Sequence, residues 1–113
     1  HIASIEGTRP ALNHAHYCAS KAGIVMHARS SALEYGRLGI RVNSVSPGLI
    51  DREGLERDWP EGVDRWKRAS ALGRPVTASE VAATVSFLAS PAASGITGTT
   101  ITVDAGWSAG PGW

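Results

Sequence analysis

A proline-free, alanine-rich stretch from about residue 13 to residue 35 constrains the fold more than any other part of this sequence. Alanine and other good helix formers predict one long helix here, with Asn13 as its N-cap and Gly36 and Gly39 as its stops. Apolar residues are spread around this helix, which indicates burial on more than one face, as at a sheet or a subunit contact. We therefore expect the helix to pack against other elements of an ordered fold.

Short β-branched segments alternate with this helix. Residues 1–4 have the character of a strand that is ending, and residues 40–45 predict a strand closed by a Ser-Pro-Gly loop. Residues 99–103 alternate threonine with isoleucine and valine and predict a last strand. Strands that alternate with helices favour an α/β fold with a parallel sheet.

Two further helices are predicted between the last two strands. Residues 51–68 are polar and charge-rich, typical of a lid, and Pro60 sits where a short helix can begin. Thr77 followed by Glu80 is a capping-box pattern that opens a helix running to Leu88.

Length and composition limit the remaining possibilities. The 113 residues allow one domain, and 42% hydrophobic positions are enough for a core without disulfides. The single cysteine, Cys18, excludes an internal disulfide framework and favours a reducing, cytoplasmic location. A net charge of +1 and the absence of a long apolar run give no reason to expect nucleic acid or a membrane as partner. The chain begins at His1 and its only methionine is Met26, so we expect a fragment of a longer product.

One pair of side chains suggests chemistry. Tyr17 and Lys21 lie one helical turn apart, on the same face of the long helix. A nearby ammonium group favours the phenolate form of tyrosine, which suits it to proton transfer. Ser4 precedes Tyr17 by 13 residues, and its hydroxyl can hydrogen-bond a substrate oxygen. By itself the Tyr-x-x-x-Lys pattern is weak, because an amphipathic helix with this pair is common.

Several further motifs occur with Ser4 and Tyr17-x-x-x-Lys21 in one order and spacing. They are Arg41–Gly48, Leu72–Pro75 with Glu80–Ala82, Phe87–Ser90 and Ile96–Gly106. Together they resemble the C-terminal half of the short-chain dehydrogenase/reductase family, over nearly the whole chain up to Trp107. The resemblance implies a Rossmann-like, doubly wound parallel sheet, of which this chain is the C-terminal half. It implies that a nucleotide-binding half precedes His1, because the Gly-rich turn of the family is not in these residues.

The resemblance also implies site roles. Tyr17 corresponds to the catalytic acid/base, Lys21 to the residue that favours the phenolate and binds the nicotinamide ribose, and Ser4 to the residue that polarises the substrate oxygen. Pro47, Gly48 and Ile50 correspond to the segment against the nicotinamide, with the Ile50 backbone at the carboxamide.

Two positions depart from the family pattern. Arg52 stands where the family often has threonine, and its guanidinium can reach a cofactor phosphate. Ala105 replaces a common glycine at the end of the last strand, a change that the sequence alone does not interpret. The cofactor is expected to be NAD or NADP, with the choice between them left open.

The candidate substrate contacts are Glu6 and, in the lid, Trp59 and Trp66, although packing is an equal alternative for the tryptophans. Trp107 and Trp113 in the C-terminal tail are predicted to anchor a neighbouring subunit of a homodimer or homotetramer.

Two other clusters are better explained without a ligand. His14, His16 and Cys18 cannot easily share one metal ion, because residues two apart on a helix point in different directions, so no metal site is expected. The two histidines are instead expected to line a loop or the mouth of the active site. The basic residues 65, 67 and 68 beside two tryptophans are balanced by nearby acidic residues, which favours a solvated lid over nucleic-acid binding.

The leading hypothesis is therefore an NAD(P)-dependent oxidoreductase that interconverts a secondary alcohol and a ketone or aldehyde. One alternative is a non-catalytic scaffold or ligand-binding protein with the same fold, which the intact set of Ser4, Tyr17 and Lys21 disfavours. Another is a non-redox lyase such as a dehalogenase, which Lys21 and Pro47-Gly48 disfavour. The lid does not distinguish a sugar from a steroid, an acyl thioester or a polyketide.

Overall fold

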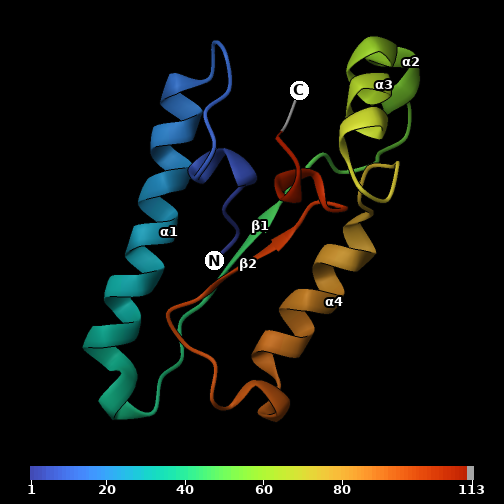
Figure 1. The fold of residues 1–113 in the computed structure, drawn as a ribbon. Coiled ribbons are helices and arrows are strands. Elements are labelled where there is room, and N and C mark those ends of the chain that lie inside the picture. The colour runs from blue at the N-terminus through green and yellow to red at the C-terminus, as the bar shows by residue number, and fades with distance from the viewer. Residues whose placement is uncertain (112–113) are drawn as a thin grey trace.

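The computed structural model describes residues 1–111 and places a parallel sheet between two long helices (Figure 1). Strand β1 (Ser44–Pro47) pairs in parallel with β2 (Thr100–Val103), with Ser44 opposite Thr100. The N-terminal segment adds to the other edge of β1 through a parallel bridge between Ile2 and Val45. The expected α/β architecture with a parallel sheet is confirmed.

Helices α1 (Ala15–Tyr35) and α4 (Ala78–Ala89) flank the strands on opposite sides (Figure 1). The core between α4 and the sheet consists of buried aliphatic residues from β1, α4 and the segments that flank α4 and β2: Val45, Val76, Val81, Leu88, Ala93 and Ala105. A parallel sheet is normally covered on both faces in this way. None of the helices in the described part of the chain is long and apolar enough to cross a membrane.

The long helix ends as predicted but begins differently. A 3₁₀ turn, η2 (Gly36–Leu38), follows it, and Gly39 closes the turn in the left-handed region with a φ of 77°. The prediction of Asn13 as N-cap is wrong: its φ of 64° is left-handed, and His14 occupies the cap position without a side-chain bond. Asparagine tolerates this backbone region better than most residues, which suits Asn13 to the turn that enters the helix.

One face of α1 is buried through Val25, Ala28 and Ala32. Met26 and Leu33, on other faces, are exposed in this chain. Burial of these residues against a second subunit stays a prediction.

Strand β1, which was predicted over residues 40–45, starts at Ser44. The side chain of Arg41 donates to the carbonyls of Leu88 and Ile96, and the Asn43 amide bonds Ile96 O and Thr99 N–H. Residues 41–43 therefore bind the loop that precedes β2 instead of joining a strand ladder.

The polar segment forms two helices, α2 (Leu55–Asp58) and α3 (Pro60–Ala69). Pro60 occupies the first turn of α3, as predicted, where its missing N–H costs no hydrogen bond. The α2–α3 unit, which we call the lid, is followed by the expected turn and then by α4.

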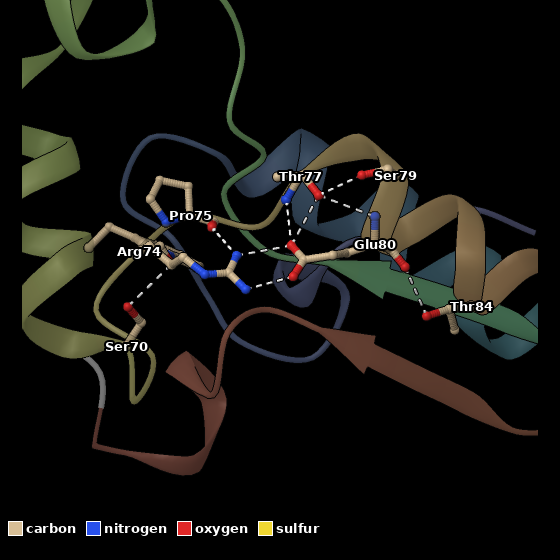
Figure 2. Close-up of polar contacts among 8 residues, drawn as sticks. Ser70, Arg74, Pro75, Thr77, Ser79, Glu80 and Thr84 are labelled. Carbon is tan, nitrogen blue, oxygen red and sulfur yellow. Dashed lines mark hydrogen bonds and ion pairs between the residues drawn. The ribbon is translucent and has the colours of Figure 1, made fainter.

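The predicted capping box of α4 is present. Thr77 Oγ1 accepts from the Glu80 N–H at 3.2 Å, and the Glu80 carboxylate accepts from the Thr77 N–H at 2.8 Å. Arg74 adds two bonds to the same carboxylate and one to the Pro75 carbonyl, as Figure 2 shows. The Glu80 carboxylate thus connects the turn that carries Arg74 to the first turn of α4.

This network makes stability depend on pH. Hydrogen bonding from Arg74, followed by that from the Thr77 N–H, lowers the pKa of Glu80 to about 2, from 4.5. A lowered folded-state pKa stabilises the protein above the unfolded value, and the contribution is lost as pH falls from about 4.5 to about 2. In urea titrations, the wild type should therefore exceed Glu80→Gln in free energy of unfolding at pH 6, and most of this difference should be lost by pH 2.

Arg74→Gln provides the matched variant, because it removes the first cause of the shift. The difference in free energy of unfolding between the wild type and Arg74→Gln should depend on pH in nearly the same way as the difference between the wild type and Glu80→Gln. A gap between wild type and Glu80→Gln that stays constant from pH 6 to pH 2 would contradict the assignment.

Ala105 has a left-handed backbone, with a φ of 56°. This region favours glycine, which explains the glycine that the family resemblance leads one to expect at the position.

Candidate active site

Ser4 ends the N-terminal segment beside the sheet. Ala3 N–H donates to Val45 O at 2.8 Å, and Val45 N–H donates to His1 O at 2.9 Å, which fixes the segment on β1. Ser4 is the N-cap of the 3₁₀ turn η1 (Ile5–Gly7), and its Oγ accepts from the Glu6 N–H at 3.2 Å. Because this bond uses an oxygen lone pair, the hydroxyl hydrogen of Ser4 can donate elsewhere.

Gly7 allows the η1 turn to lie directly on α1. A Cβ at this position would be 2.9 Å from the carbonyl oxygen of Lys21. This close approach places Ser4 next to the turn of α1 that carries the predicted tyrosine and lysine.

Tyr17 and Lys21 lie together on α1, as their spacing predicts. The Lys21 Nζ is 5.4 Å from the centre of the Tyr17 ring. Among the described residues it has one hydrogen bond, at 3.4 Å to Ile2 O, so two of its three donors are available for a ligand.

A cavity of about 430 Å³ opens between η1, α1, the end of β1 and the lid. Its lining includes the predicted Ser4, Glu6, Tyr17, Gly48, Ile50 and Trp59. Its other lining residues are Ile5, Arg9, Pro10, Ala11, His14, Leu49, Trp66 and Trp107. Lys21, Pro47 and Arg52 are not in the lining.

Two tryptophans form one wall of the cavity. The rings of Trp66 and Trp107 are stacked, with centres 5.4 Å apart and planes within 2° of parallel. They are only 3% and 7% exposed. Trp66 therefore both packs in the core and faces the cavity, while the prediction of Trp107 as a subunit anchor is wrong because its ring is buried in its own chain. Trp113 lies outside the described residues.

The loop after β1 brings backbone to the cavity. A Cβ on Gly48 would be 2.6 Å from the Trp66 ring and 2.7 Å from Asp104, so the wall can close only over glycine. Ile50 forms a parallel bridge with Val76, but the bonds of that bridge are made by Leu49 O and Asp51 N. The N–H and C=O of Ile50 bond no other described residue, which leaves one donor and one acceptor for a ligand.

Arg52 points to the lid in this structure. Its Nη1 donates to Asp58 Oδ2 at 3.0 Å and to Glu53 O at 3.2 Å. Hydrogen bonds from Arg52 and then Arg57 hold the pKa of Asp58 below its usual value. The predicted contact of Arg52 with a cofactor phosphate would require the Arg52–Asp58 ion pair to open.

Glu6 and His14 meet at the edge of the cavity. The Glu6 Oε2 is 2.9 Å from His14 Nδ1 and accepts a weak bond from Cys18 Sγ at 3.8 Å. Of the two histidines expected to line a loop or the mouth of the site, His14 lines this cavity and contacts the Tyr17 ring, at 6.1 Å between centres, whereas His16 is not in the lining.

Sequence reasoning missed Ile5, Arg9, Pro10, Ala11 and Leu49 as cavity residues. The first four lie in or after the turn that follows Ser4, where nothing local marks them as cavity residues. Leu49 could have been found, because it stands between the predicted Gly48 and Ile50.

The structure also shows the partners of the histidine–cysteine cluster and of the basic cluster in the lid. Residues 1–111 contain no group of three or more histidine, cysteine or acidic side chains placed to hold a metal. Lys67 of the basic cluster pairs with Glu56 at 2.8 Å. The neighbouring Trp66 ring is buried, so it cannot stack on a nucleic-acid base.

Comparison with known proteins gives relatives along nearly the whole chain. Residues 1–108 match the family model described as enoyl-(acyl carrier protein) reductase. Meso-2,3-butanediol dehydrogenase of Serratia marcescens is 40% identical over 111 residues, 97% of this chain and 44% of that protein. A 3-oxoacyl-acyl-carrier-protein reductase of Mycobacterium tuberculosis is 40% identical over 112 residues, 96% of this chain and 44% of that protein.

Solved structures agree with the sequence relatives. A 4-hydroxyisoleucine dehydrogenase complexed with NADH superimposes with a TM-score of 0.88 at 32% identity, over 96% of this chain and 46% of that one. The chain thus spans less than half the length of the relatives it matches. Since the family model covers nearly all of its residues and the fold agrees, the chain belongs to the short-chain dehydrogenase/reductase family and has part of that family's Rossmann-like α/β fold.

Proposed function

We propose that the complete protein containing this chain is an NAD(P)-dependent oxidoreductase that interconverts a secondary alcohol and a ketone or aldehyde. The observation that carries the proposal is the cavity into which both Ser4 and Tyr17 face, with Lys21 one turn from Tyr17. Several relatives are named as dehydrogenases or reductases, which supports the same class of reaction.

The groups around the cavity suit the nicotinamide end of NAD or NADP. The free N–H and C=O of Ile50 complement a carboxamide, which has one acceptor and one amino donor group. The available donors of Lys21 suit ribose hydroxyls. When bound, the nicotinamide would accept or supply the hydride.

The protein side chains would then handle the proton and the oxygen. In oxidation, the Tyr17 phenolate takes the hydroxyl proton of the alcohol, and the Ser4 hydroxyl donates to the oxygen as the carbonyl forms. The Lys21 ammonium stabilises the phenolate, and the stacked tryptophans provide an apolar wall for the substrate. In reduction the proton moves in the opposite direction.

Other parts of the proposal concern the complete protein. We infer that a nucleotide-binding half precedes His1, that Glu6 and Trp59 contact the substrate, and that Pro47, Gly48 and Arg52 lie toward the cofactor. A cytoplasmic homodimer or homotetramer is part of the same proposal.

The test is turnover by the complete protein of a panel of secondary alcohols with NAD⁺ and with NADP⁺, followed by absorbance of the reduced nicotinamide. We expect activity with one of the two cofactors and binding of that cofactor in calorimetry. Cofactor binding without turnover would favour the non-catalytic alternative, and a reaction that needs no nicotinamide would favour the lyase alternative.

A further inference from the structure

One carboxylate in the cavity, that of Glu6, accepts hydrogen bonds at only one of its two oxygens. The side chain of Glu6 is 24% exposed and lies in the lining with Ser4 and Tyr17. Its Oε2 accepts from His14 Nδ1 and Cys18 Sγ, whereas no described residue donates to Oε1. Oε1 is therefore an acceptor on the cavity lining that is open to a donor group of a bound molecule.

The position of this acceptor is fixed by the same turn that positions Ser4. The Glu6 N–H donates to Ser4 Oγ at 3.2 Å, and the bond to His14 holds the carboxylate from the side of α1. A molecule that bonds Ser4 and Tyr17 through one oxygen therefore has a second, fixed acceptor beside it.

The charge in the cavity indicates a neutral donor. Arg9 also lines the cavity, where its guanidinium lies 5.9 Å from the centre of the Trp107 ring and donates to Ser108 O at 2.7 Å. The charges of Arg9 and Glu6 are of opposite sign, so the cavity has no excess negative charge to attract a cation. The opposite wall is apolar, formed by Trp66 and Trp107.

We propose that Glu6 selects substrates that carry a second hydroxyl group beside the reacting alcohol, with Oε1 accepting from that hydroxyl and His14 holding the carboxylate in place. The substrate is then a diol or polyol with an apolar part that lies on the tryptophan wall. This inference rests on the proposed function, because it assumes that the reacting oxygen binds Ser4 and Tyr17.

The test compares cyclohexanol with cis-1,2-cyclohexanediol, which differ by one hydroxyl group, in the complete protein. The wild type should have the higher kcat/KM for the diol. A hydrogen bond to a charged group corresponds to about 10- to 100-fold, so Glu6→Ala should reduce the diol-to-alcohol ratio of kcat/KM by that factor. Glu6→Gln keeps an acceptor oxygen and should restore part of the ratio.

Glu34→Ala, at an exposed site on α1, is the matched control and should keep the wild-type ratio. The proposal is overturned if Glu6→Ala leaves the ratio within about twofold of wild type, since one hydrogen bond predicts more. It is also overturned if kcat/KM is higher for 2-aminocyclohexanol than for the diol and Glu6→Ala removes this difference. The recognised group would then be a cation.

Failure of the proposed function gives a different result. In that case no alcohol is turned over with either cofactor, and binding is read from the fluorescence of the cavity tryptophans. Tighter binding of the diol than of cyclohexanol, lost in Glu6→Ala, would still support the hydroxyl site. Equal binding of the two would overturn it.

Discussion

Replacing Tyr17 with phenylalanine is expected to lower kcat of the complete protein by about 10²- to 10⁴-fold, the usual contribution of a general acid/base. The change removes only the phenolic oxygen of Tyr17, which lines the cavity with Ser4 and is the atom proposed to transfer the proton. The aromatic ring stays in contact with His14 and Lys21, so the local packing is kept. The measurement is steady-state kinetics with a secondary alcohol and NAD⁺ or NADP⁺.

Tyr35→Phe is the matched control, because Tyr35 is a comparably exposed tyrosine at the other end of the same helix. It should leave kcat close to wild type. If Tyr17→Phe keeps wild-type turnover, Tyr17 is not the proton-transfer group.

Replacing Trp66 with alanine is expected to lower the free energy of unfolding by about 3–5 kcal/mol, the usual cost of deleting a buried large aromatic side chain. Its ring is 3% exposed, stacks on Trp107 and packs over Gly48, and its Nε1 donates to Arg74 O at 3.2 Å. Removal therefore leaves a void between the lid and the sheet, and the Arg74 carbonyl keeps only the 3.5 Å bond from Ser70 Oγ. Urea unfolding of the complete protein measures the change.

Trp59→Ala is the control variant, because it removes a lid tryptophan that is not buried. Trp59 is 42% exposed and lines the same cavity from α2–α3. Its removal should cost clearly less stability than that of Trp66. Equal losses for the two variants would show that Trp66 does not carry the packing described above.

The elements that sequence predicted well are those set by local rules. The Thr77–Glu80 capping box, Pro60 at the start of α3 and the one-turn spacing of Tyr17 and Lys21 all depend on residues a few positions apart. The family resemblance added Ser4, whose place beside Tyr17 depends on the close approach at Gly7.

The predictions that were wrong concern residues whose conformation or burial depends on other parts of the chain. Asn13 has the residue type of an N-cap, but the chain needs a left-handed turn there, so the cap shifts to His14. Residues 41–43 have strand-forming character, yet the side chains of Arg41 and Asn43 and the backbone of Val42 bind the loop before β2. Trp107 closes the cavity through Trp66, 41 positions earlier, a pairing that no local pattern encodes.

The link between Arg9 and Ser108 joins residues 99 positions apart. During synthesis on the ribosome, Ser4, Tyr17 and Lys21 emerge before Trp107 and Ser108, which follow them in the sequence by more than 80 residues. A nascent chain can therefore form the helix with its tyrosine and lysine long before it can form the aromatic wall. The cavity is complete only when translation has delivered the segment with Trp107, so termination before Trp107 would leave Ser4 and Tyr17 without the opposite aromatic wall.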